Sequence, residues 1–126
     1  MPENASSIWL VAREYEGWAS AGGVKDVVHD MARALTELGW QVHVCLPLYG
    51  FLKDRVFQEG QRSWTGRSQH PVFRHEGECW TVSSGNLHLH FFRFSSVEHK
   101  QGIYTVTLAE QNPALKLVHG NGYPDT

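Results

Sequence analysis

The sequence has few cysteines and lacks several patterns that would place it in a particular class of protein. No apolar run approaches the roughly 20 residues of a membrane-spanning helix, and residues 1–7 are too short and polar for a secretory signal. The net charge is −2 and no block of like charges occurs, which argues against a nucleic-acid surface. We therefore predict a cytoplasmic protein with no nucleic-acid or membrane partner.

Metal-binding and hydrolase motifs are also missing. The two cysteines, Cys45 and Cys79, lie in apparent strands, so we expect buried thiols and no disulfide. His88 and His90 share one face of a predicted strand, but no His-Glu-x-x-His helix, Cys-x-x-Cys pair or third ligand accompanies them. Neither Gly-x-Ser-x-Gly nor a Walker loop occurs. We expect no metal and no cofactor, and we predict that both histidines are hydrogen-bonded within the sheet.

Residues 8–47 have the pattern of a strand, a glycine turn, an amphipathic helix and a second strand. The apolar run Ile8–Val11 is typical of a strand covered on both faces. Gly39 is placed to take positive φ at the helix end, and residues 42–46 resume a strand that Pro47 ends. Apolar residues recur at helical spacing between them: Val24, Val27, Val28, Met31, Leu35 and Leu38. We predict a βαβ unit with parallel, neighbouring strands.

The glycine pair Gly22-Gly23 stands directly before this helix. Without Cβ atoms, the backbone can approach a phosphate closely, and the first N–H groups of a helix point toward such an anion. In parallel sheets, ligands bind beyond the carboxyl ends of the strands, where this turn lies. A glycine pair also connects a strand to a helix for steric reasons alone, and the pair by itself does not separate the two interpretations.

Three separated segments resemble one enzyme family. Residues 11–28 are similar to the opening of bacterial glycogen synthases and plant starch synthases, with Glu14, Gly22-Gly23 and Asp26-Val27 at matching positions. Leu46-Pro47-Leu48-Tyr49-Gly50 resembles the Leu-Pro-x-Tyr-Gly segment of that family, and residues 120–125 resemble its Tyr-Pro-Asp-Asn segment. The three segments occur in the family's order.

The resemblance implies a Rossmann-like three-layer α/β/α fold with a mainly parallel sheet, forming part of the N-terminal lobe of a two-lobed glycosyltransferase. The implied reaction transfers glucose from ADP-glucose to the non-reducing end of an α-1,4-glucan with retention, without a metal. No catalytic residue is assigned. The resemblance implies these substrate-binding residues: Glu14, Ser20, Gly22, Gly23, Asp26, Tyr123 and Asp125.

The turn departs from the family pattern in its charge. The family's lysine falls on Ser20, its threonine on Ala21 and its proline on Gly17. Serine cannot supply the positive charge that would offset a diphosphate. Either donor binding is weakened, or Lys25 or Arg13 supplies the cation, or this chain has lost activity. The carboxylate of Asp26 would in any case complement the helix dipole.

Two alternatives remain open at this point. Related two-lobed glycosyltransferases also open with a Gly-Gly turn, and a non-catalytic carbohydrate-binding module or pseudoenzyme remnant would tolerate Ser20. We expect the second lobe to be missing, so the fragment alone should be inactive. Because such a fragment leaves sheet edges and an apolar face uncovered, we also expect self-association or marginal stability.

The rest of the chain reads as one partial lobe spanning residues 1–126. We predict a disordered lead at residues 1–7, a short helix at 51–57, a loop at 59–69 and a β-rich part at 71–107. In that part, residues 72–73 and 79–82 suggest a hairpin, residues 83–86 a turn, and residues 87–94 and 102–106 strands. Residues 108–122 read as a loop.

Overall fold

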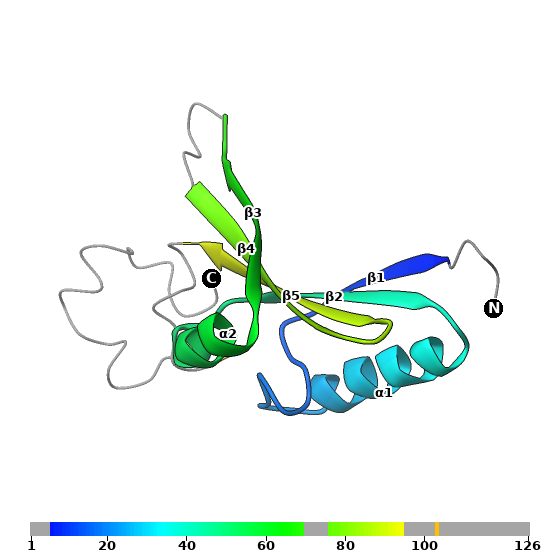
Figure 1. Cartoon of the computed structure of the whole chain (residues 1–126). Coiled ribbons are helices and arrows are strands. Elements are labelled where there is room, and N and C mark those ends of the chain that lie inside the picture. Colours follow the sequence, from blue (N-terminus) through cyan, green and yellow to red (C-terminus); the bar gives the residue numbers. More distant parts are fainter. Residues whose placement is uncertain (1–5, 70–75, 95–102, 104–126) are drawn as a thin grey trace.

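The computed structural model describes residues 6–69, 76–94 and 103 (Figure 1). One sheet contains all the strands of this part of the chain, in the order β1-β2-β5-β4-β3. The elements follow one another along the chain as β1 (Ser7–Val11), α1 (Val24–Glu37), β2 (Gln41–Pro47), η1 (Gly50–Leu52), α2 (Lys53–Glu59), β3 (Gln61–Arg67), β4 (Glu76–Ser84) and β5 (Leu87–Phe94).

The sheet is mixed. Strands β1 and β2 are parallel neighbours joined through α1, as predicted, and β2 pairs in parallel with β5. The β5–β4 and β4–β3 pairings are antiparallel. The prediction of a mainly parallel sheet is therefore wrong for this part of the chain. The reason is the two-residue connection Gly85-Asn86, with Gly85 at φ +57°, which is long enough only for a hairpin.

Both α-helices cover the same face of the sheet, and they lie together below it in Figure 1. This face carries the buried residues Val42 and Val44 of β2 and Phe91 of β5. Helix α1 packs against it through Ala32, which is fully buried, and α2 packs through Phe57, whose ring centroid lies 4.5 Å from that of Trp80. In the described residues the fold thus has two layers.

Helix α1 presents only part of its apolar surface to the sheet. Val28 and Leu35 pack beside Ala32. The other apolar residues that were predicted at helical spacing face outward. Their exposed fractions are between 46% and 74%: Val24, Val27, Met31 and Leu38. Gly39, with φ +95°, follows the helix end as predicted.

The second half of the chain contains a strand that the sequence pattern did not predict. Residues 61–67, expected within a loop, form β3 at the sheet edge, and all but one of them are exposed. This strand pairs with β4 (Figure 1), so long-range pairing and not local apolar content makes it extended. Strand β4 extends beyond the predicted strand at 79–82 at both ends, from Glu76 to Ser84, and β5 has the predicted bounds.

Several predictions fall outside the described residues. These concern the strands at 72–73 and 102–106, the loop at 108–122 and the lead at residues 1–5. The lead was predicted to run to residue 7, but Ser7 already belongs to β1. Cys45 and Cys79 are free thiols and no disulfide joins them, as predicted; Cys79 is buried, but Cys45, which was also expected to be buried, is half-buried. No helix in the described ranges is long and apolar enough to cross a membrane.

The sheet face opposite the helices carries a stack of aromatic and histidine rings. The ring centroids of Trp9 and His43 are 4.1 Å apart, and those of His43 and His88 are 4.9 Å apart. His43 Nδ1 and His90 Nε2 share a hydrogen bond of 2.9 Å, and His90 Nδ1 lies 2.8 Å from the Thr81 hydroxyl. His88 is hydrogen-bonded to Ser83 and Gln41. Both strand histidines are therefore hydrogen-bonded, as predicted.

This stack makes stability depend on pH. Burial, and then the neighbouring His43 and His88, lower the pKa of His90 to about 4. In the unfolded chain, His90 accepts a proton below its ordinary pKa of about 6.5, whereas in the folded chain it stays neutral down to about pH 4. The contribution of neutral His90 to the free energy of unfolding is therefore complete above about pH 6.5 and is lost as the pH falls toward 4. We expect the free energy of unfolding in urea to fall by about 1–2 kcal/mol between about pH 7.5 and about pH 4 through this group.

The measurement needs a matched variant because other groups titrate in the same range. His90→Gln should reduce the pH dependence, whereas His29→Gln, on α1 and outside the stack, should retain it. Equal pH dependence in His90→Gln and the parent chain would contradict the assignment.

Candidate functional site

The loop between β1 and α1 lies at the carboxyl end of β1 and holds most of the predicted site residues. Its first part is a tight turn in which Tyr15 N–H donates to Ala19 O at 2.9 Å and Ala19 N–H donates to Tyr15 O at 3.0 Å. Gly17 takes φ +85° within this turn. Because proline is restricted to φ near −65°, the family's proline does not fit this backbone, which explains that departure.

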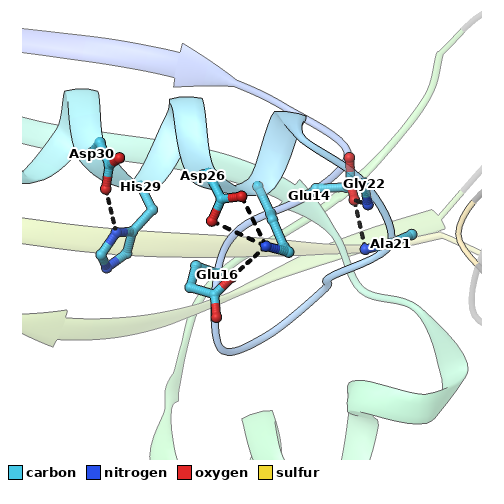
Figure 2. Close-up of polar contacts among 8 residues, drawn as sticks. Glu14, Glu16, Ala21, Gly22, Asp26, His29 and Asp30 are labelled. Carbon is cyan, nitrogen blue, oxygen red and sulfur yellow. Dashed lines mark hydrogen bonds and ion pairs between the residues drawn. The ribbon is translucent and has the colours of Figure 1, made fainter.

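The second part of the loop is held by Glu14. This side chain is fully buried, and its Oε1 accepts hydrogen bonds from the N–H groups of Ala21 at 2.6 Å and Gly22 at 2.5 Å (Figure 2). The carboxylate thus shapes the loop from beneath. A direct contact of Glu14 with a sugar stays a prediction, and in this conformation none of its surface is open to solvent.

The glycine pair is not required by the packing of the described residues. A Cβ atom on Gly23 would meet no atom within 4 Å, and one on Gly22 would make only ordinary contacts of 3.8 and 3.9 Å with the Glu14 carboxylate. Gly23 has φ −75°, which any residue adopts. Contacts among the described residues therefore give no steric reason for the pair, and the close approach of a ligand to this backbone stays a prediction.

The start of helix α1 lies beside this exposed backbone. The first residue to donate a hydrogen bond inside the helix is Asp26, whose N–H reaches Gly23 O at 3.2 Å. The N–H groups of Val24 and Lys25 precede it, as at any helix start. These donors and the helix dipole favour an anion. Ser20, Gly22, Gly23 and Asp26 are all exposed around this point.

The cation nearest this turn in sequence is already paired. Lys25 Nζ lies 3.0 Å from Glu16 Oε2 and 2.9 Å from Asp26 Oδ2 (Figure 2). These hydrogen bonds, to Asp26 first and then to Glu16, raise the pKa of Lys25. One ammonium between two carboxylates leaves this group of residues with net negative charge. Arg13, the other candidate, donates from Nη2 to the carbonyl of Ile103 at 2.8 Å.

Two residues that sequence reasoning assigned no role hold the loop from outside. The Tyr49 hydroxyl donates to Arg13 O at 2.9 Å, and burial raises the pKa of Tyr49. Arg55 of α2 donates to Gly17 O at 2.6 Å, and its guanidinium lies 3.4 Å from the centre of the Trp18 ring. The role of Tyr49 could have been found from the sequence, because Tyr49 belongs to a segment that resembles the family. No feature of the sequence indicated the role of Arg55, because its contacts are distant in the chain.

The remaining predicted site residues are not brought to the turn. Tyr123 and Asp125 lie outside the described residues, so their role stays a prediction. No group of three histidine, cysteine, aspartate or glutamate side chains in the described ranges is arranged to hold a metal ion.

Comparisons with known proteins agree on one family. Residues 7–117 match the family described as starch synthase catalytic domain. Glycogen synthase 1 of Synechocystis is 35% identical over 66 residues, and glycogen synthase of Gloeobacter violaceus is 41% identical over 59 residues. These matches cover 52% and 47% of this chain but only 14% and 13% of the relatives.

A solved structure shares the fold. It is the catalytic domain of starch synthase IV from Arabidopsis thaliana bound to ADP and acarbose. The match has a TM-score of 0.58 and 20% identity, and it covers 73% of this chain and 19% of that one. The chain therefore corresponds to a small part of the length of these relatives.

The buried carboxylate makes a testable contribution to stability. Glu14→Ala leaves the N–H groups of Ala21 and Gly22 without their acceptor, and we expect a loss of about 3 kcal/mol in the free energy of unfolding in urea. Glu16→Ala, which removes a half-exposed carboxylate of the same loop, should cost less than about 1 kcal/mol. Similar stabilities for the two variants would show that Glu14 does not organise the loop.

Proposed function

This chain belongs to the family of starch synthase catalytic domains, and on that premise we propose that it is the N-terminal part of a glycogen or starch synthase. The whole enzyme would transfer glucose from ADP-glucose to the non-reducing end of an α-1,4-glucan with retention, in the cytoplasm. The observation that carries the proposal is the exposed Gly22-Gly23 pair at the start of α1, for which the described residues give no packing reason.

In the proposed arrangement, the turn receives the diphosphate of the donor. The N–H groups at the start of α1 would face the phosphate oxygens, and the absent side chains of Gly22 and Gly23 would let the backbone approach them. Glu14 would position this backbone through Ala21 and Gly22. The protein's part in catalysis would be electrostatic stabilisation of the leaving nucleotide.

The full three-layer Rossmann-like lobe is also part of this proposal. In the described residues, helices cover one sheet face, and the face with Trp9 and His43 carries none. We propose that further parts of the enzyme, including a second lobe, cover this face and complete the donor site. Until they do, the exposed rows of α1 and the outer edge of β1 favour self-association of the isolated chain.

A second candidate function is favoured by the charges around the turn. Ser20 carries no charge, and Lys25 is held between Glu16 and Asp26. A diphosphate therefore meets net negative charge here. If no other part of the enzyme offsets this charge, the chain serves as a non-catalytic carbohydrate-binding module or pseudoenzyme lobe.

Titration calorimetry with ADP-glucose at fixed, low salt separates these candidates. We expect Ser20→Lys to bind at least about tenfold more tightly than the parent chain, because it places a cation beside the diphosphate. Raising the salt concentration should reduce this gain. Ser84→Lys, which adds the same charge at an exposed position of β4, should leave the affinity unchanged. If the two lysine variants bind equally, or if Ser20→Lys gives no gain, the turn does not receive the donor diphosphate.

A further inference from the structure

Arg55 is the residue through which helix α2 reaches the loop between β1 and α1. Its Nη1 donates a hydrogen bond to the carbonyl of Gly17 at 2.6 Å, and its guanidinium lies 3.4 Å from the centre of the Trp18 ring. On the helix itself, its Nε donates to Glu59 Oε2, one turn further on, at 2.6 Å. A single side chain therefore makes contacts in three directions, and two of these contacts go to neighbouring residues of the loop.

The planar guanidinium of Arg55 is what permits these contacts together. It donates from several N–H groups in its own plane, and it presents a flat, positively charged face to an aromatic ring. A lysine ammonium could replace one of the contacts, but a single point charge cannot serve an acceptor at the edge and a ring at the face in the same way. The contacts of Arg55 thus depend on its shape as well as on its charge.

Helix α2 is fixed on the sheet, so these contacts start from a rigid base. Val56 is fully buried, and the ring centroid of Phe57 lies 4.5 Å from that of Trp80 in β4. Trp18 also contacts the core, since its ring centroid lies 5.0 Å from that of Phe91, which is fully buried in β5. The first half of the loop is therefore attached both to α2 and to the centre of the sheet.

This half of the loop leads directly into the turn of the candidate site. Ala19 is the only residue between Trp18 and Ser20, and it is fully buried. Its N–H and its C=O are both hydrogen-bonded to Tyr15. Because each residue has only two soft dihedral angles, so short a connection carries a shift of Trp18 into the backbone that follows. The position of Trp18 therefore determines how the chain approaches Gly22-Gly23.

We propose that Arg55 is a positioning residue for the turn at Gly22-Gly23: it fixes Gly17 and Trp18 on helix α2 and thereby fixes where the backbone after them lies. Without Arg55, the first half of the loop opens locally while α1 and the sheet stay folded. The diphosphate as the ligand of the turn rests on the proposed function, whereas the attachment of the loop to α2 rests on the contacts of Arg55 alone.

Amide hydrogen exchange of the full chain, followed by NMR, measures this attachment directly. In Arg55→Gln we expect the amides of Ala19 and Gly22 to exchange about tenfold faster than in the parent chain, which corresponds to the loss of one hydrogen bond from a charged donor. The amide of Trp40, which is hydrogen-bonded to Leu35 O at the far end of α1, should keep its rate.

Two further variants separate the shape of Arg55 from its charge and from its pairing on the helix. Arg55→Lys keeps the positive charge but not the planar group, and we expect its loop amides to exchange as fast as those of Arg55→Gln. Arg33→Gln removes the same charge from another Arg–Glu pair with i,i+4 spacing, that of Arg33 and Glu37 on α1. In this control the loop amides should exchange as in the parent chain. Circular dichroism and thermal melting check that all variants are folded.

Titration with ADP-glucose shows whether the attachment matters for binding. The titration compares Ser20→Lys with Ser20→Lys/Arg55→Gln, because binding is expected to be tightest in the first. We expect the double variant to bind about tenfold more weakly, since a displaced backbone no longer meets the phosphate oxygens in the right geometry. This loss should persist at raised salt, because positioning does not act through the charge of Arg55 on the ligand.

The outcomes distinguish the role of Arg55 from the proposed function. Unchanged exchange at Ala19 and Gly22 in Arg55→Gln overturns the inference, and so does full recovery in Arg55→Lys, because charge alone would then suffice. Faster exchange at Trp40 as well overturns it, because the whole fold would have loosened. Equal ADP-glucose affinity with and without Arg55 also overturns it. If no variant binds ADP-glucose, the proposed function of the turn falls, while faster exchange confined to the loop still supports its attachment through Arg55.

Discussion

The buried carboxylate of Glu14 is the constraint on which the candidate site depends. Its Oε1 holds two successive backbone N–H groups, at Ala21 and Gly22, directly before helix α1. A buried charge without partners is costly, so these bonds and the conformation of the loop are coupled. The loop therefore presents the backbone of Gly22 and Gly23 at the helix start, at the carboxyl end of β1.

The core supports this loop from one side of the sheet. Tyr49 follows β2 and ties the backbone of Arg13, while Arg55 of α2 ties Gly17. Helix α2 in turn packs on β4 through Phe57 and Trp80. The turn, the core and the β3–β4 arm are thus one packed unit, although their residues are far apart in the chain.

Charge decides what the turn can do by itself. The helix dipole and the accessible backbone favour an anion, while Glu16 and Asp26 outnumber the single ammonium of Lys25 between them. Ser20 adds no charge where the family has a lysine. The two effects oppose each other, and the Coulomb interaction of a diphosphate with a full charge exceeds its interaction with the partial charge of a helix end. Under the proposed function, donor binding would therefore require positive charge from elsewhere in the enzyme.

Local pattern and tertiary contacts determined different parts of this molecule. The sequence alone determined the unit from β1 to β2 and the bounds of β5, because each rests on residues close together in the chain. It also determined the family, through short motifs that can each be read locally. Only the tertiary structure decided that half of the strand pairings are antiparallel, that residues 61–67 are a strand, and that Val24, Val27, Met31 and Leu38 face outward. It also decided that Glu14 is buried beneath the loop and that Lys25 is already paired. These features depend on partners from distant segments, and local spacing carries no information about which partner a strand edge, a helix face or a charge will meet.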